Sequence, residues 1–355
     1  MGGQPRDITL GVPQGSILGP LLFFIYINDL LDFSGFLSLL FADDTTLLLS
    51  HNDLKTLIFQ ANQEFKNICD FFRANKLSIH PDKTKFILFT TKKINNDDIH
   101  IYCNNNNDNQ NLPELITPIE QITTDSSTPA VKFLGIFVDP NLNFKYHIQY
   151  IKSKLSKSLF AMRAAKNYLN TDSLKMLYFA IFHSHLLYAN IIWSSADNTA
   201  VNSIYKLQKA AVRILDNAKY NQHTEPIFKK HGILPLPDLL DFSKLQFMHR
   251  HKLNLLPTSF NDFWTNNQQR DIGVNQIRLR NIEDYSIPFS RISLVKNLPY
   301  NSIPALWNSF PNNEIKNLQS VTLFDSQLKT YYINDLASQV NCNRLFCPTC
   351  YVSDN

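Results

Sequence analysis

Two adjacent aspartates, Asp43 and Asp44, are the residues of this 355-residue chain whose type and setting most clearly suggest chemistry. They lie between two apolar runs, residues 36–42 and 45–49, each of a length suited to a β-strand. The pattern predicts a tight hairpin with the aspartates at its turn, where Asn-Gly or Asp-Gly would be usual because the favoured turns need positive φ. Adjacent carboxylates repel each other and lose hydration, so they need a compensating cation. A solvated turn is the simple interpretation, and a site for divalent metals that bind phosphate oxygens is the functional one.

A second motif, GVPQGS at residues 11–16, precedes the aspartates and opens a long apolar segment. Pro13 fixes a turn, and the hydroxyl of Ser16 can accept from an unpaired amide at the start of the helix that follows. We expect this helix to end near Ser34-Gly35 and to direct four side chains into a core: Leu21, Leu22, Ile25 and Leu30. The order is therefore turn, helix, strand, Asp-Asp, strand.

This order, with the strings GVPQGSILGPLLF at residues 11–23 and FADD at residues 41–44, resembles the palm of reverse transcriptases. These sequence motifs are similar to those of the reverse transcriptases of non-LTR (LINE-type) retrotransposons, with the jockey-like group as the candidate branch. The resemblance implies that Asp43 and Asp44 hold Mg²⁺ or Mn²⁺ at a metal-binding hairpin. It also implies contacts to template and incoming nucleotide from Gly11, Pro13, Gln14, Gly15 and Ser16.

Two further stretches take a role from the same resemblance. A lysine near the leaving pyrophosphate falls on Lys83 or Lys85, and we assign it to Lys83 as a catalytic residue; a lysine-rich turn before a strand at residues 86–90 is the plain alternative. Phe133-Leu134-Gly135 looks like the primer-grip hairpin, in which a glycine lets the backbone approach the primer end closely. Taken alone, the tripeptide would carry no information.

The implied fold class is α+β: a truncated polymerase palm, an antiparallel sheet with packed helices, followed by a mostly helical thumb and C-terminal region. Residues 1–140 would form the partial palm, without fingers and first catalytic strand, and include an Asn-rich, low-complexity loop at about 95–129. Residues 141–256 would form the thumb, and 257–355 a C-terminal region. Helical periodicity predicts these helices: residues 53–76, from 146 onward with an apolar stripe that includes Leu169, 174–193, 201–215, 236–255 and 321–337.

Positive charge is concentrated in the predicted thumb. The net charge is only +4, yet residues 141–219 contain eleven lysines and arginines against three aspartates. Basic charge gathered on helices is the electrostatic footprint of a phosphate backbone, and a set of merely solvated helix faces is the alternative. The residues expected to contact nucleic acid flank the apolar stripe of the first thumb helix: Lys152, Lys154, Lys157 and Arg163.

The five cysteines do not make a disulfide framework, which indicates a reducing compartment, cytosol or nucleus. Weak zinc binding is conceivable at three C-terminal cysteines, Cys342, Cys347 and Cys350. A closed zinc site requires four ligands, however, and no His or Cys follows Cys350, so we expect a flexible tail instead.

No secretory signal is recognised. The most apolar run, residues 17–27, is shorter than the about 20 residues that cross a bilayer, so we expect no membrane partner.

We therefore expect a fragment of an RNA-directed DNA polymerase whose intact parent uses an RNA template, a DNA primer and dNTPs. A non-catalytic nucleic-acid-binding protein is the first alternative, with binding that weakens steeply with salt and is indifferent to Asp43. A decaying transposon remnant is the second, with poor solubility because the palm edge lacks its partner strands.

The chain by itself is predicted not to polymerise. Palm polymerases place a third carboxylate on an earlier strand, and Asp7, the one carboxylate before Gly11, does not have the matching context. Losing a metal ligand from such a site should cost several powers of ten in rate. In a primer-extension assay on an RNA template, the wild-type chain and Asp43→Asn should both stay at background. Extension at a rate that falls with Asp43→Asn would show the prediction to be wrong.

Overall fold

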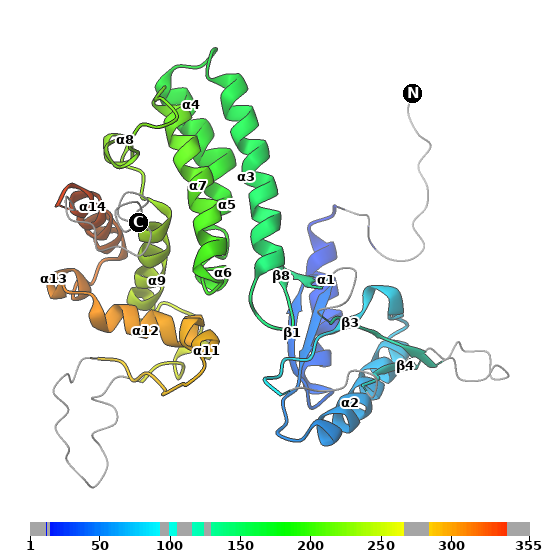
Figure 1. The fold of residues 1–355 in the computed structure, drawn as a ribbon. Helices are drawn as coiled ribbons and strands as arrows, with labels where there is room; N and C mark the ends of the chain where they lie inside the picture. The colour runs from blue at the N-terminus through cyan, green and yellow to red at the C-terminus, as the bar shows by residue number, and fades with distance from the viewer. Residues whose placement is uncertain are drawn as a thin grey trace, which may run out of the picture. The chain divides into compact units, whose positions relative to one another are not determined.

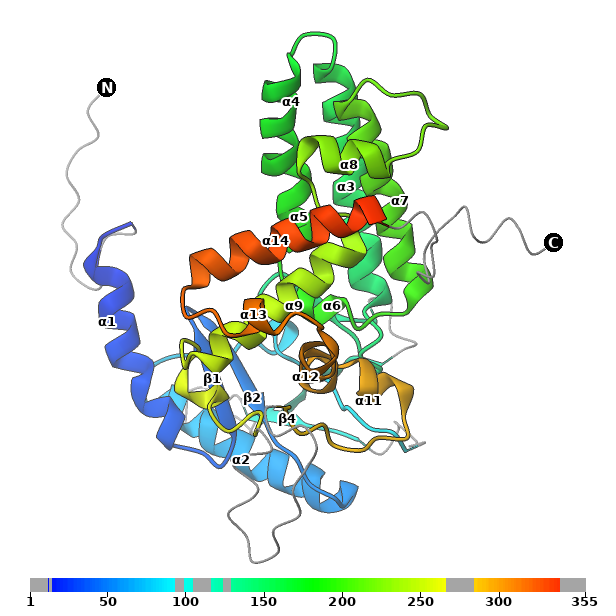
Figure 2. The same ribbon diagram turned by 90° about the vertical axis from the view of Figure 1, so that its left-hand side faces the viewer.

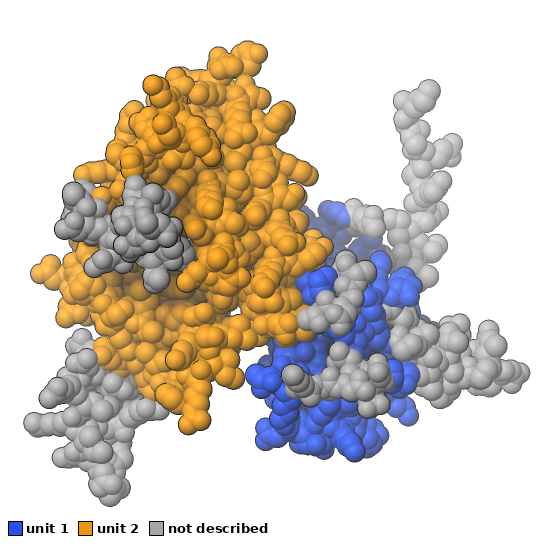
Figure 3. Space-filling model, in the orientation of Figure 1, with its two compact units in different colours: residues 1–131 blue, residues 132–355 orange. Residues whose placement is uncertain are grey.

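The structure is a computed structural model that describes residues 12, 15–92, 99–104, 116–123, 129–265 and 284–338. It divides into two compact units, residues 1–131 and 132–355, which Figure 3 shows in blue and orange and which are described separately here. Helices predominate, and the strands of the described residues form four small two-stranded sheets. The predicted α+β class is confirmed, and the assignment to palm and thumb stays a prediction.

Unit 1 begins with helix α1 (Leu18–Ile27), which continues as a 3₁₀ turn over Asn28–Asp32. The antiparallel hairpin of β1 (Leu37–Phe41) and β2 (Asp44–Leu48) follows, and then the long helix α2 (Leu54–Ala74) (Figure 1). Two short sheets complete the unit: β3 (Lys85–Phe86) pairs in parallel with β6 (Glu120–Gln121), and β4 (Tyr102–Asn104) pairs antiparallel with β5 (Ile116–Pro118).

The core of unit 1 lies between α2 and the β1–β2 hairpin. Phe65, Ile68 and Phe71 of α2 are buried, together with Leu30 from the 3₁₀ turn. The carboxylate of Asp53 accepts a hydrogen bond from the Thr56 amide at 2.8 Å, so the predicted start of this helix is confirmed.

Two expectations for unit 1 are wrong. Only Leu30 of the four side chains assigned to a core is buried, because α1 is apolar on all sides and the described residues leave most of it uncovered; Leu21, Leu22 and Ile25 are exposed. The strand predicted at residues 86–90 is reduced to β3. The predicted loop at residues 95–129 contains β4, β5 and β6, and its residues 95–98, 105–115 and 124–128 lie outside the described part.

Unit 2 opens with the hairpin of β7 (Val131–Phe133), whose first residue closes unit 1, and β8 (Ile136–Val138). Helix α3 (Lys145–Ala165) packs along α7 (Asn198–Leu215), and between them in sequence run α4 (Thr171–Leu177), a π-helix (Tyr178–His183), α5 (Ser184–Leu187) and α6 (Asn190–Trp193). The remaining α-helices of the described residues are α8 (Glu225–His231), α9 (Leu236–Lys252), α11 (Ser293–Asn297), α12 (Pro299–Ser309), α13 (Asn313–Lys316) and α14 (Val321–Ser338).

One apolar core joins these helices, except for α11, which has no buried residue. Leu155 of α3, Trp193 of α6 and Phe324 of α14 all belong to it, and α14 lies against α9, as Figure 2 shows. The core thus runs across the boundary predicted at residues 256 and 257. The single helix predicted over residues 174–193 is wrong: it is interrupted by the π-helix and again at Ala189, where φ is 50°. Leu169, expected in the apolar stripe of α3, is exposed.

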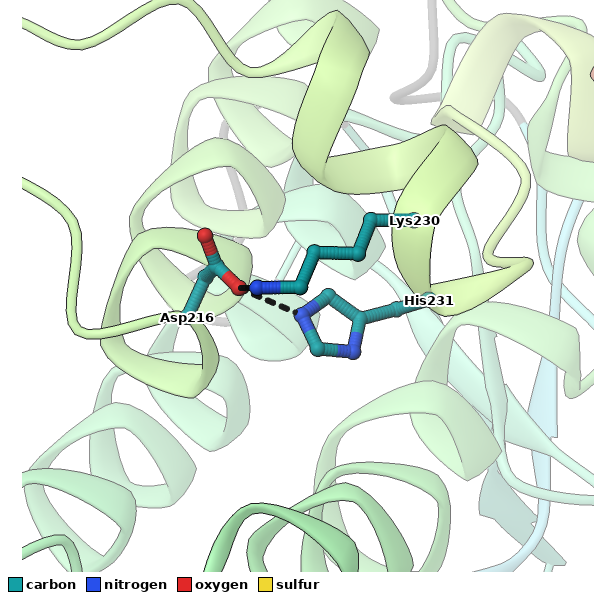
Figure 4. A network of polar contacts seen from close by, with 3 residues as sticks. All are labelled: Asp216, Lys230 and His231. Atoms are coloured by element: carbon teal, nitrogen blue, oxygen red, sulfur yellow. Dashed lines mark hydrogen bonds and ion pairs between the residues drawn. The ribbon is translucent and has the colours of Figure 1, made fainter.

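A polar contact fastens α7 to α8. Asp216, just after α7, accepts hydrogen bonds from Lys230 Nζ at 2.6 Å and from His231 Nε2 at 2.8 Å (Figure 4). Burial acts to raise the pKa of the Asp216 carboxyl, but the two hydrogen-bonded partners outweigh it and hold this pKa below its usual value.

No helix among the described residues is long and apolar enough to cross a membrane.

The contrast between the two faces of α3 gives a stability prediction. Leu155→Ala leaves a cavity in the core and should lower the free energy of unfolding by about 2–5 kcal/mol, whereas Phe160→Ala, on the exposed face, should change it by no more than about 0.5 kcal/mol. All three tryptophans, Trp193, Trp264 and Trp307, are buried in unit 2, so tryptophan fluorescence in a urea titration reports this unit. Equal destabilisation by the two substitutions would contradict the packing.

Candidate functional site

The β1–β2 hairpin places the two aspartates in different backbone settings. Phe41 pairs with Asp44, so the turn consists of Ala42 and Asp43, and Asp44 is the first residue of β2. The hairpin is confirmed, but the expectation that both aspartates form the turn is off by one residue. Ala42 takes the positive φ, 53°, that the tight reversal requires, which is uncommon for a residue with a Cβ.

Both carboxylates are exposed, and neither makes a hydrogen bond or ion pair with another described residue. They are hard oxygen donors, the kind that Mg²⁺ and Mn²⁺ prefer, and Mg²⁺ is commonly held by one or two carboxylates while it keeps waters or binds phosphate. Within the described residues, no group of three or more His, Cys, Asp or Glu side chains is gathered as a metal site. The pair therefore fits a metal that completes its coordination with water or substrate oxygens.

The motif before the hairpin is described in part. Gly11, Pro13 and Gln14 lie outside the described residues. Gly15 has φ of +82°, a conformation that favours glycine, and Ser16 Oγ accepts a hydrogen bond from the Gly19 amide at 3.1 Å. Ser16 thus satisfies one amide at the start of α1, as predicted, although the helix itself begins at Leu18.

The structure separates the two candidate lysines. Lys85 Nζ is 2.7 Å from Glu120 Oε2 across the β3–β6 pair. Lys83, at the end of a 3₁₀ turn over Pro81–Lys83, is exposed and forms no ion pair with a described residue. Of the two lysines, Lys83 is thus the one whose ammonium group has no ion-pair partner among the described residues.

The Phe133-Leu134-Gly135 turn packs against Tyr188, a residue that the sequence analysis did not identify. Leu134 and Gly135 both have positive φ, 44° and 85°. The Tyr188 hydroxyl donates a hydrogen bond to the Leu134 carbonyl, and a Cβ on Gly135 would lie 3.2 Å from the Tyr188 ring. Trp193 Nε1 in turn donates to the Tyr188 carbonyl at 2.9 Å, which fixes the tyrosine where the helix breaks.

The strand that follows this turn is tied to α3. The Phe137 amide donates to His147 Nδ1 at 3.3 Å, and burial lowers the pKa of His147 to about 4, so the ring is neutral at pH 7 and Nδ1 can accept. The Asp139 carboxylate accepts from the Phe144 amide at 2.7 Å at the start of the helix. The turn is therefore supported by Tyr188 and, through the strand that follows it, by α3.

The four predicted phosphate-binding residues all lie on α3. Lys157 and Arg163 are exposed, and Lys152 and Lys154 are half-buried, with Lys154 Nζ 5.4 Å from the centre of the Tyr150 ring. The three cysteines considered for zinc, Cys342, Cys347 and Cys350, lie outside the described residues.

Comparison with protein families finds a match that includes the aspartate hairpin. Residues 2–138 match the family "Reverse transcriptase (RNA-dependent DNA polymerase)", so this stretch is similar to reverse transcriptases. Together with the relatives below, this match confirms the predicted resemblance to the enzymes of non-LTR retrotransposons.

Among curated proteins, the chain is 27% identical over 229 residues to the probable RNA-directed DNA polymerase from transposon BS of Drosophila melanogaster. It is also 27% identical over 241 residues to the RNA-directed DNA polymerase from mobile element jockey of Drosophila funebris. These matches cover 61% and 62% of this chain but 23% of each relative, so the chain spans less than a quarter of the length of these two relatives. No solved structure matches the chain significantly.

Substitution of Gly135 tests the support of the turn by Tyr188. Gly135→Ala should destabilise unit 2 by more than Gly232→Ala, because both glycines have positive φ, worth about 1–2 kcal/mol for an L-residue, but only Gly135 meets a neighbouring side chain. The excess should disappear in a Tyr188→Ala background. The loss of stability in each variant is measured from the urea midpoint, followed by tryptophan fluorescence. Equal losses of stability for the two glycine substitutions would contradict the contact with Tyr188.

Proposed function

We propose that this chain supplies part of the catalytic domain of an RNA-directed DNA polymerase of a non-LTR retrotransposon, acting on an RNA template, a DNA primer and dNTPs. The observation that carries the proposal is the hairpin with Asp43 and Asp44, exposed and without partners among the described residues, inside the reverse transcriptase match. In this proposal unit 1 belongs to the palm, and the helices from α3 to α9 belong to the thumb.

Each residue of the site then has a defined task. Asp43 and Asp44 would hold Mg²⁺ or Mn²⁺, which when bound neutralises phosphate charge and makes a hydroxyl a better nucleophile. Lys83 offers an ammonium group to the leaving pyrophosphate, since Lys85 is paired with Glu120. The Leu134-Gly135 turn presents its backbone to the primer end, and Gly15 and Ser16 line the path of template and nucleotide.

The second candidate, a nucleic-acid-binding protein without catalysis, is supported by α3. Between residues 140 and 171 the sequence contains six lysines and arginines and no acidic residue. Such a surface binds phosphates with an affinity that falls as salt rises. The two candidates differ in whether Asp43 and Asp44 bind metal.

Iron-directed cleavage tests the metal site whether or not the chain polymerises. Fe²⁺ bound in place of Mg²⁺, with ascorbate and peroxide, should cut the backbone within a few residues of Asp43, and Mg²⁺ should compete. Asp43→Asn and Asp44→Asn should each reduce this cut at least about tenfold, because a hard cation loses one of two carboxylate ligands. Asp172→Asn, an exposed aspartate of α4, is the matched control.

A cut near Asp43 that survives both substitutions would contradict the ligand assignment, and no cut at this hairpin at saturating Fe²⁺ would favour the binding protein.

A further inference from the structure

We propose that the exposed face of α3 binds an unpaired nucleic-acid strand, with Phe160 stacking on a base while Lys157 and Arg163 bind the phosphates on either side. This inference deepens the proposed function, because it names the form of nucleic acid that the basic helix takes. It concerns residues of unit 2 alone.

The exposed face is continuous along the helix. Its members recur at the spacing of one side of an α-helix, and all are exposed; they are Gln149, Ser153, Ser156, Lys157, Phe160, Arg163 and Ala164, and the exposed Asn167 follows just after the helix. The opposite side carries Leu155, Leu159 and Met162, which are buried in the core. α3 therefore presents a straight polar and cationic stripe to the solvent.

Phe160 stands at the centre of this stripe. It is 74% exposed, although the helix has a buried side that could have taken a phenylalanine, and it makes no ring contact with another described aromatic residue. Tyr168, 88% exposed, follows just beyond the end of the helix. Exposed aromatic rings beside cations are the arrangement by which proteins bind single strands, because every unpaired base has a face to stack on.

The charges of the stripe are available. Lys157 and Arg163 lie three residues before and after Phe160, and neither forms an ion pair with a described residue. Since no acidic residue lies between residues 140 and 171, nothing in this segment cancels their charge. A polyanion is thus the complementary ligand.

The aromatic ring favours a single strand over a duplex. In a double helix the bases are stacked on each other, so their faces are covered and the two cations alone would contribute. In an unpaired strand the bases can turn toward the protein and stack on Phe160. The stripe also contains hydroxyl and amide side chains and only one large apolar residue, which suits a nucleic-acid strand better than a lipid surface, where an apolar face is needed.

Fluorescence anisotropy with the full chain tests this directly. The probes are a labelled 12-nucleotide oligo(dT), an oligo(U) of equal length and a 12-base-pair duplex. The wild type should bind both single strands more tightly than the duplex. Phe160→Ala should weaken single-strand binding about tenfold or more and leave duplex binding unchanged. The double substitution Lys157→Gln, Arg163→Gln should weaken all three and flatten the dependence on salt.

Tyr220→Ala is the matched control, because Tyr220 is 92% exposed in unit 2 but lies in the connection between α7 and α8. It should leave every affinity unchanged. The urea midpoint of each variant, read by tryptophan fluorescence, shows that unit 2 is folded. Equal loss for Phe160→Ala and Tyr220→Ala, equal loss on single strand and duplex, or binding by the stripe to phosphatidylserine vesicles in place of oligonucleotides would overturn the proposal.

The result is separable from the metal site. If iron cleavage fails while the Phe160 effect is observed, the stripe stands as a binding surface and the polymerase assignment falls. If cleavage succeeds and Phe160→Ala has no effect, the polymerase assignment stands and the stripe does not.

Discussion

The candidate site depends on the register of the β1–β2 hairpin. With Phe41 opposite Asp44, the strands direct Leu40 and Leu47 toward the core formed with α2 and leave Asp43 in the turn. A shift of one residue would reverse every side chain of a strand, because successive residues point to opposite faces. The partial burial of two leucines and the position of the carboxylates are thus consequences of the same pairing, and the positive φ of Ala42 is the local strain that this pairing requires.

In unit 2 an equivalent constraint acts at the break after α5. Tyr188 leaves the helical conformation, Ala189 has positive φ, and the buried Trp193 holds the Tyr188 carbonyl. The break lets the tyrosine hydroxyl reach Leu134. A glycine turn that would otherwise have many conformations is thereby fixed, as the role proposed for it at the primer end would require.

Local features were predictable from sequence and distant contacts were not. The start of α2 near Asp53, the amphipathic period of α2, α3 and α7, and the existence of the aspartate hairpin follow from residues close together in the chain. Tyr188 and Leu134 are 54 residues apart, and only the fold brings them together. The ion pair of Lys85 with Glu120, which leaves Lys83 available, depends on a parallel pairing that no local pattern predicts.

The predictions that were wrong, for α1 and for the helix at residues 174–193, also failed because the sequence pattern does not contain the deciding contacts. α1 is apolar on every side, so periodicity could not show which residues a core would take, and Leu21, Leu22 and Ile25 proved to be exposed. The π-helix after α4 has the same apolar residue content as a regular helix, so the sequence pattern could not distinguish the two. In the structure, the Ile181 carbonyl of this π-helix accepts a hydrogen bond from the Ser158 hydroxyl of α3 at 2.6 Å.

The most direct test of the account is to locate a metal at the aspartate hairpin. Crystals of the full chain soaked in Mn²⁺ would show bound manganese by anomalous scattering. The account predicts a manganese peak within direct coordination distance of carboxylate oxygens of both Asp43 and Asp44, and this peak should be lost in crystals of Asp43→Asn. Manganese bound elsewhere at the same concentration, with none at this hairpin, would contradict the central claim.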